Sequence, residues 1–329
     1  MAKPKVFVAR RIFQEALDMI SKEAEVELWE DEMPPPREVL LRRVEGKDGV
    51  LSLLTDKVDG ELMDRAPKLK VISQIAVGYD NIDVAEATKR GIPVGYTPGV
   101  LTDATADMAF LLMMAASRRL VEGMDFVRAA KWKTWHPLHF LGPDISGATL
   151  GIIGMGRIGF EMAKRARGFS MPVIYSDIYR RKPEEEREHG LTYMSMDDVL
   201  KKADFVSVHV NLTKETYHLI SDKQLEVMKP TAVLVNAARG PVVDPKALYK
   251  ALKAKKIFAA GLDVTEPEPI KMDDPLLTLD NCVIVPHIAS ATFKTRLKMS
   301  TMAAENLIAG LKEEKLPTCV NPQVYEGKR

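Results

Sequence analysis

The sequence predicts an α/β protein made of two doubly wound parallel sheets, each covered by helices on both faces. Short apolar runs alternate with amphipathic stretches along most of the 329 residues, which is typical of parallel strands joined by helices. The alternation breaks at Thr97-Pro98-Gly99 and starts again, after a long helical stretch, at a glycine-rich turn. The length is enough for about two domains.

The first series is regular. We expect strands at residues 6–8, 26–29, 50–54, 70–75 and 93–96, with helices at 13–22, 37–44, 62–66 and 82–90. The first helix is predicted by apolar residues at Phe13, Ala16, Leu17 and Ile20, which share one helical face. The last one ends at Gly91, a residue that commonly terminates helices.

The second series begins with helical stretches at 103–119 and 122–130, followed by an aromatic loop from 132 to 147. We expect strands at 150–153, 173–176, 205–210, 232–236, 259–263 and 283–286 and a helix at 160–168, while the charged run 182–188 is interpreted as a solvated helical face. A final helix at 293–312 leads to a tail too short to fold alone, so we expect it to rejoin the first domain. The predicted domains are 1–100 plus 289–329, and 101–288.

Charge and composition exclude several classes of protein. Forty-seven basic and forty-six acidic residues give a net charge of +1, which argues against a nucleic-acid-binding protein. No apolar run reaches the roughly 18 residues of a membrane span, and the N-terminus has no secretory apolar segment. Cys282 and Cys319 cannot form a disulfide framework and lack zinc-ligand spacing, so we predict no metal site and a cytoplasmic location.

The clearest motif is Gly154-Met155-Gly156-Arg157-Ile158-Gly159, placed between a predicted strand and a predicted helix. Gly154 allows a tight turn, Gly156 lets backbone approach a pyrophosphate, and Gly159 lets helix and strand pack closely. The helix N-terminus attracts phosphate. Asp177 ends the next strand, eighteen positions past Gly159, where a carboxylate binds ribose hydroxyls and repels a 2′-phosphate. NAD(H) is therefore favoured, with NADP(H) as the alternative because Arg180 and Arg181 follow closely.

Three more polar groups follow predicted strand ends, where ligands bind in doubly wound sheets. Arg239 follows the strand at 232–236, Glu266 and Glu268 follow the strand at 259–263, and His287 follows the strand at 283–286. An arginine binds a carboxylate through two parallel hydrogen bonds, and a histidine transfers a proton near neutral pH. Beside a nicotinamide, such a set can interconvert a 2-keto acid and a 2-hydroxy acid. No nucleophile elbow or P-loop lysine supports a hydrolase or an NTPase.

These motifs resemble the D-isomer-specific 2-hydroxyacid dehydrogenase family. The resemblance rests on segments that run through the chain in the family's order: Val77–Asp83, Gly151–Gly159, Asn236–Gly240, Gly261–Pro269 and Pro286-His287-Ile288. Within the family, Thr97–Asp107 and Trp135-His136-Pro137 are most similar to glyoxylate/hydroxypyruvate reductases. The resemblance implies two Rossmann-like domains with the site in the cleft between them, and a homodimer formed through the cofactor domain.

The resemblance also implies roles for individual residues. Arg239 would hold the substrate carboxylate and His287, paired with Glu268 rather than Glu266, would donate the proton. Residues implied at the cofactor are Thr105, Gly154, Gly156, Arg157, Ile158, Gly159, Asp177, His209, Thr216, Ala237, Asp263 and Ala289. Residues implied at the substrate are Leu53, Val77, Gly78, Arg239, His287 and Trp135, with Trp132 as the alternative aromatic that reaches into the partner's site. The chain departs from the family at Asn211, usually Pro, and at Ala289, often Gly.

The predicted activity is NAD(P)H-dependent reduction of glyoxylate to glycolate and of hydroxypyruvate to D-glycerate. Two alternatives stay open within the family, a D-lactate dehydrogenase and a D-3-phosphoglycerate dehydrogenase. From another class, some relatives are dinucleotide-sensing corepressors, which would bind NADH with little turnover. The complete set of Arg239, Glu268 and His287 favours an enzyme.

Overall fold

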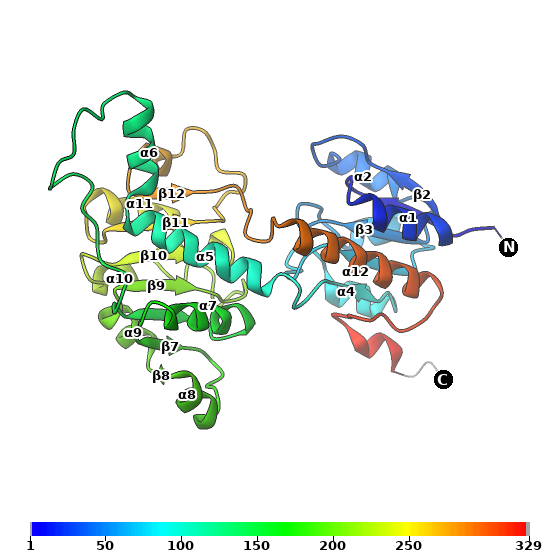
Figure 1. Cartoon of the computed structure of the whole chain (residues 1–329). Coiled ribbons are helices and arrows are strands. Elements are labelled where there is room, and N and C mark those ends of the chain that lie inside the picture. Colours follow the sequence, from blue (N-terminus) through cyan, green and yellow to red (C-terminus); the bar gives the residue numbers. More distant parts are fainter. Residues whose placement is uncertain (1, 327–329) are drawn as a thin grey trace. The chain divides into compact units, whose positions relative to one another are not determined.

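The computed structural model describes residues 2–326, and the chain forms two compact units. Unit 1 contains the described residues up to Leu101 and those from Ala291 onward, and unit 2 contains Thr102–Ser290. The sequence analysis placed the two boundaries after residues 100 and 288. In each unit a sheet of parallel strands carries helices on both faces (Figure 1).

Unit 1 has a five-stranded sheet in the order β2-β1-β3-β4-β5. Its elements are β1 (Lys5–Val8), α1 (Gln14–Glu23), β2 (Glu25–Leu28), α2 (Arg37–Arg43), β3 (Gly49–Ser52), α3 (Gly60–Arg65), β4 (Val71–Gln74), α4 (Val84–Lys89), β5 (Val94–Gly95), α12 (Phe293–Leu311) and the 3₁₀ helix η3 (Pro322–Tyr325). Asp59 and Asp83 cap α3 and α4 by accepting hydrogen bonds from backbone N–H groups of the first turns.

Alternate residues of the unit 1 strands face two separate cores. Val6, Val8 and Leu51 pack with α1 and α12, whereas Phe7 and Val50 pack with α2, α3 and α4. Strands buried on both faces favour apolar residues at consecutive positions, as at 6–8 in β1 and 50–51 in β3. The last helix, α12, thus completes the core of the domain in which the chain began.

Unit 2 has a seven-stranded parallel sheet in the order β12-β11-β10-β9-β6-β7-β8. Its elements are α5 (Thr102–Ser117), α6 (Leu120–Arg128), β6 (Leu150–Ile153), α7 (Arg157–Arg167), β7 (Val173–Ser176), α8 (Pro183–His189), β8 (Leu191–Tyr193), α9 (Met196–Lys202), β9 (Phe205–Val208), α10 (Asp222–Val227), β10 (Val233–Asn236), η1 (Gly240–Val242), α11 (Pro245–Lys253), β11 (Ala259–Leu262), η2 (Pro275–Thr278) and β12 (Cys282–Ile284).

The unit 2 sheet also separates two cores. One face packs on α5 and α7 and the other on α9, α10 and α11. The order reverses at β6, because β7 lies on one side of it and β9 on the other. The carboxyl ends on either side of such a reversal form the crevice where doubly wound proteins bind ligands.

The structure differs from the sequence prediction in local details. Helix α7 begins at Arg157 rather than at residue 160, so the glycine motif itself enters the first turn. The short edge strand β8 was not predicted, since its three residues show little apolar character. The predicted aromatic loop is confirmed, because no helix or strand lies between Arg128 and Leu150. Among the residues described, no helix combines the length and apolarity needed to cross a membrane.

Candidate active site

The glycine motif forms a turn in which each of the three positions requires glycine for a different physical reason. Gly154 has φ +95°, and a Cβ there would lie 2.7 Å from the carbonyl oxygen of His209. A Cβ on Gly159 would lie 2.2 Å from the carbonyl oxygen of Gly154, so the helix could not pack so closely on the turn. A Cβ on Gly156 would meet no protein atom within 4 Å. The turn therefore leaves open space at Gly156, beside the N-terminus of α7, where a pyrophosphate can approach backbone N–H groups.

Asp177, which follows β7, is tied to this turn. Its carboxylate accepts hydrogen bonds from the backbone N–H of Met155 at 2.6 Å and from that of Tyr179 at 2.8 Å. These bonds fix the carboxylate beside the glycine turn. This is the position from which a carboxylate can bind ribose hydroxyls.

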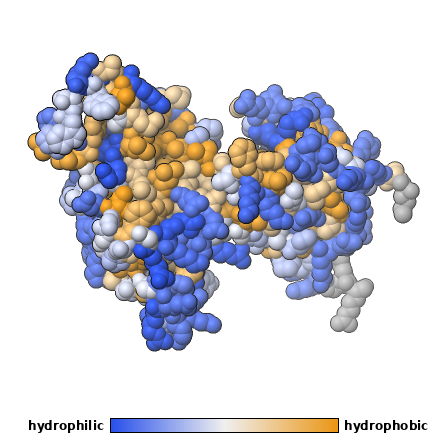
Figure 2. Space-filling view, viewed as in Figure 1, coloured by the Kyte–Doolittle hydropathy of each residue, from blue (hydrophilic) through white to orange (hydrophobic). Residues whose placement is uncertain are grey.

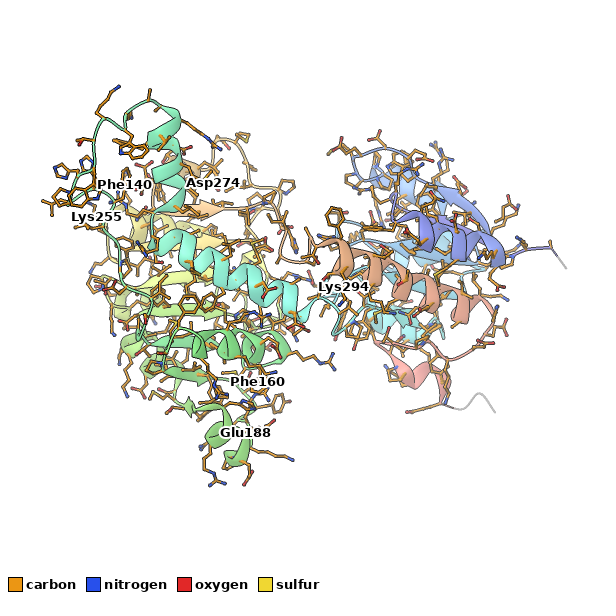
Figure 3. All side chains as sticks on the ribbon, in the orientation of Figure 1. Phe140, Phe160, Glu188, Lys255, Asp274 and Lys294 are labelled. Carbon is orange, nitrogen blue, oxygen red and sulfur yellow. The ribbon has the colours of Figure 1, made fainter. Side chains whose placement is uncertain are left out.

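The two arginines after Asp177 are both engaged within the protein. Arg180 donates two hydrogen bonds to Glu186, at 2.9 and 2.7 Å. Arg181 lies over the ring of Phe160, 4.0 Å from its centroid, and donates to the carbonyl of Met155. Figure 3 marks the position of Phe160 in unit 2. Both guanidinium groups are therefore held by acceptors within unit 2, and the charge of Arg180 is paired with the Glu186 carboxylate.

Glu186 is the residue that the sequence interpretation misjudged. The run 182–188 was expected to be solvated, but Glu186 is only 8% exposed. It accepts a hydrogen bond from the buried Tyr175 hydroxyl at 2.7 Å in addition to those from Arg180. The bonds from Arg180 and Tyr175 lower the pKa of Glu186 to about 2, whereas burial raises the pKa of Tyr175 to about 12. The sequence signal for this network was weak, namely a tyrosine in an otherwise apolar strand.

His287 and Glu268 form the central pair of the site. The Nδ1 atom of His287 lies 2.6 Å from a carboxylate oxygen of Glu268, and both side chains are partly exposed. The backbone N–H of His287 donates to the carbonyl oxygen of Asp263 at 2.8 Å. The Asp263 carboxylate accepts from the N–H groups of Ile288 and Ala289, so this residue fixes the loop that carries His287. Burial raises the pKa of Asp263 against the effect of those N–H donors.

Arg239 lies on a turn after β10 that is ordered by Asn236. The Asn236 side chain donates to the Arg239 carbonyl at 2.9 Å and accepts from the Ala238 N–H at 3.1 Å. A Cβ on Gly240 would lie 1.9 Å from the carbonyl oxygen of Thr265. The loop bearing Arg239 and the loop leading to Glu268 are therefore in direct contact, which brings two of the three predicted catalytic loops together.

His209 follows β9, and its carbonyl lies against Gly154. Its Nε2 atom is 2.8 Å from the Ser207 hydroxyl, and burial lowers its pKa to about 4. The imidazole is therefore neutral at physiological pH. The Thr216 hydroxyl donates to the Asn211 carbonyl at 2.6 Å, which orders the loop after His209.

Several other predicted residues also lie in unit 2. Thr105 on α5 and Ala237 after β10 are buried, whereas Trp135 and Trp132 are 78% and 65% exposed in the loop before β6. His136 and His139 stack ring on ring, with centroids 4.1 Å apart.

The remaining predicted substrate residues, Leu53, Val77 and Gly78, lie in unit 1 after the neighbouring strands β3 and β4. Asn81 connects them by donating to the carbonyl of Leu53 at 3.1 Å and to the side-chain oxygen of Gln74 at 2.7 Å. Gln74 donates in turn to the carbonyl of Gly78 at 2.7 Å. The sequence analysis missed both amides, although Gln74 lies within the strand predicted at 70–75, where a glutamine is a signal for such a network. The structure shows that Gln74 is fully buried.

A dinucleotide turn together with a histidine–carboxylate pair and an arginine at the same edge of a sheet defines a dinucleotide-dependent oxidoreductase. The comparisons with known proteins identify the family. Residues 110–289 match the model of the D-isomer specific 2-hydroxyacid dehydrogenase NAD-binding domain. The chain belongs to this family, and it is an NAD(P)-dependent enzyme acting on a CH–OH group.

Three similar proteins cover nearly the whole chain. The glyoxylate reductase of Korarchaeum cryptofilum is 55% identical over 325 residues, which is 98% of each protein. The structure of the TT0316 protein from Thermus thermophilus is 45% identical, with a TM-score of 0.90 over 96% of this chain and 99% of that one. The structure of an NADPH-dependent glyoxylate/hydroxypyruvate reductase from Sinorhizobium meliloti, in complex with NADP and malonate, is 31% identical, with a TM-score of 0.86 over 98% of each chain.

Proposed function

We propose that this enzyme reduces glyoxylate to glycolate and hydroxypyruvate to D-glycerate. The observation that carries the proposal is the 2.6 Å pair of His287 and Glu268, in a chain 55% identical to a glyoxylate reductase. Glyoxylate is a 2-keto acid, so its reduction needs a proton donor for the carbonyl oxygen and a cation for the carboxylate. The pair and Arg239 match those two needs.

Each group has one task in this proposal. Arg239 binds the substrate carboxylate. His287 gives its Nε2 proton to the carbonyl oxygen, while Glu268 at Nδ1 holds the ring and stabilises its protonated form. When bound, the reduced nicotinamide supplies the hydride to the carbonyl carbon. The turn at Gly154–Gly159 and Asp177 would hold that cofactor.

The domains divide the work accordingly. We assign residues 101–288 to the dinucleotide-binding domain, which also carries Arg239, Glu268 and His287, and residues 1–100 with 289–329 to the substrate domain. The match of 110–289 to an NAD-binding domain supports the first assignment. The polar network of Gln74 and Asn81, which orders the backbone at Gly78 in unit 1, supports the second.

NADH is the proposed cofactor in preference to NADPH. The Asp177 carboxylate is fixed beside the glycine turn by the N–H of Met155 and would repel a 2′-phosphate. Arg180, which could attract that phosphate, is committed to Glu186. Both features favour the unphosphorylated ribose.

The activity test mixes purified protein with glyoxylate and follows the absorbance of NADH and of NADPH separately, then repeats with hydroxypyruvate, pyruvate and phosphohydroxypyruvate. Rapid NADH oxidation with the first two acids supports the proposal. Faster oxidation of NADPH would refute the cofactor assignment alone. Preference for pyruvate or phosphohydroxypyruvate would replace the substrate with that of a sister enzyme, and tight NADH binding without turnover would refute the enzymatic function.

A homodimer is the proposed assembly. Large apolar side chains are exposed along α5, α6 and the following loop (Figure 2), among them Leu111, Met124, Val127, Trp132, Trp135 and Leu138. Exposed apolar surface of this extent is typical of protein–protein interfaces. Light scattering on the eluting protein tests the assembly, and a monomeric mass at micromolar concentration would refute it.

A further inference from the structure

A second histidine–carboxylate pair shares a loop with the first. The Nε2 atom of His218 is 2.6 Å from a carboxylate oxygen of Glu266, two residues before Glu268. Tyr217 stacks on the His218 ring at a centroid distance of 4.0 Å, and its hydroxyl donates to the other Glu266 oxygen at 3.1 Å. Glu266 therefore has partners on both carboxylate oxygens.

His218 contacts three loops that follow three adjacent strands. It lies on the loop after β9, its backbone N–H donates to the carbonyl of Pro241 at 2.7 Å in the loop after β10, and its ring pairs with Glu266 in the loop after β11. Asp244 lies 3.9 Å from the Nδ1 atom, so two carboxylates face the imidazole. These loops carry His209, Arg239 and Glu268 of the proposed active site.

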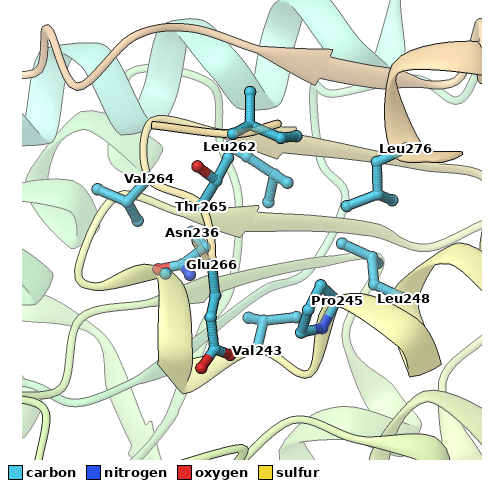
Figure 4. A pocket seen from close by; sticks show the side chains of 11 residues that line it. Asn236, Val243, Pro245, Leu248, Leu262, Val264, Thr265, Glu266 and Leu276 are labelled. Carbon is cyan, nitrogen blue, oxygen red and sulfur yellow. The ribbon is translucent and has the colours of Figure 1, made fainter. Parts of the chain in front are cut away.

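A small cavity lined mainly by apolar side chains, including Val243, Leu248, Leu262 and Leu276, lies next to Thr265 and Glu266 (Figure 4). The backbone at Thr265 packs closely against Gly240, and the polar contacts to His218 and Tyr217 restrain the Glu266 side chain.

We propose that His218 is a positioning residue that holds the Glu266–Glu268 segment, so that Glu268 stays aligned with His287. The argument rests on the proposed function, because Glu268 matters only if His287 transfers a proton. His218 does not touch the reacting atoms. It acts through Glu266, and the short spacing between Glu266 and Glu268 transmits the restraint to the carboxylate that holds the catalytic imidazole.

The test compares His218→Ala, His218→Gln and a control variant, Glu226→Gln, which removes a 2.6 Å ion pair with Lys256 outside these loops. Loss of a positioning contact is expected to lower kcat for glyoxylate by roughly 10-fold, while the KM and the NADH dissociation constant change by less than about 2-fold. Glutamine keeps an N–H donor near the Nε2 position, so His218→Gln is expected to recover most of kcat. The control is expected to behave as the wild type.

A double-mutant cycle identifies the route of the effect. In a Glu268→Gln background, His218→Ala is expected to cause little further loss of kcat, because both substitutions disable the same group. Full additivity would overturn the proposal, as would an unchanged kcat in His218→Ala, or parallel losses of kcat, NADH affinity and melting temperature that His218→Gln does not rescue.

Hydrogen exchange of peptides covering 263–270 gives a readout independent of turnover. Exchange in this segment is expected to rise in His218→Ala and not in Glu226→Gln. If the wild type reduces no keto acid, the proposed function fails, and unchanged exchange would separately refute the tie between His218 and the loop.

Discussion

Replacing His209 tests how burial at the cofactor edge of the sheet couples stability to pH. His209 is held neutral because its imidazole is shielded from water, which lowers its pKa from 6.5 to about 4. Its Nε2 atom meets the Ser207 hydroxyl, and its Nδ1 atom has no hydrogen-bond partner among the described residues. A glutamine at this position can keep a hydrogen bond to Ser207 but cannot be protonated.

The sign follows from the two pKa values. In the unfolded chain the histidine binds a proton below about pH 6.5, whereas in the folded chain it stays neutral down to about pH 4. The contribution of neutral His209 to the free energy of unfolding is therefore fully present above pH 6.5 and is lost as the pH falls toward 4. The full difference corresponds to roughly 3 kcal/mol, and about 2 kcal/mol of it has developed by about pH 5.

The assay is urea unfolding of the cofactor-free protein at several pH values between about 5 and 7.5, with hydrogen exchange of β9 peptides as a probe of unit 2. We expect the wild type to lose about 2 kcal/mol more than His209→Gln between the ends of this range. A difference between the two proteins that does not depend on pH would show that His209 is not held neutral by burial, and would refute the reasoning.

Three further predictions concern the site and the core. Glu268→Gln should lower kcat for glyoxylate by about 100-fold while the NADH affinity stays within about 2-fold of the wild type. Steady-state kinetics measure kcat and fluorescence titration measures the NADH affinity, and a loss of affinity in place of a loss of kcat would contradict the prediction. Gly156→Ala should weaken NADH binding without changing the melting temperature, because the added Cβ meets no protein atom within 4 Å. Gly159→Ala should lower both the NADH affinity and the melting temperature, because the added Cβ would lie 2.2 Å from the Gly154 carbonyl oxygen. Equal losses of melting temperature in the two variants would argue against this distinction. Burial raises the pKa of Cys282 to about 12, so at about pH 8 its thiol should react with a thiol reagent far more slowly in the folded than in the unfolded chain. Rapid labelling of Cys282 in the folded protein, separated from labelling of Cys319 by peptide mass, would disprove this.

Two doubly wound domains were predictable from the sequence because their strands are buried on both faces. Burial of this kind favours consecutive apolar residues, as at 150–153 and 232–235, and such runs are a local signal in the sequence. The glycine turn was equally legible, because Gly154 has a positive φ of +95° and Gly159 lies against the carbonyl oxygen of Gly154, five residues earlier. The short edge strand β8 escaped prediction because an edge position makes weak demands on its three residues.

The polar pairs were decided by tertiary structure. Nothing local indicates that Glu186 is buried against Tyr175, or that His218 meets Glu266 across 48 positions of sequence. Position alone did not separate Glu266 from Glu268, whereas the structure pairs Glu268 with His287 and Glu266 with His218. Carboxyl ends of parallel strands collect residues from distant parts of the chain, so sequence determines which chemical groups are present, and only the order and register of the strands determine which of them meet.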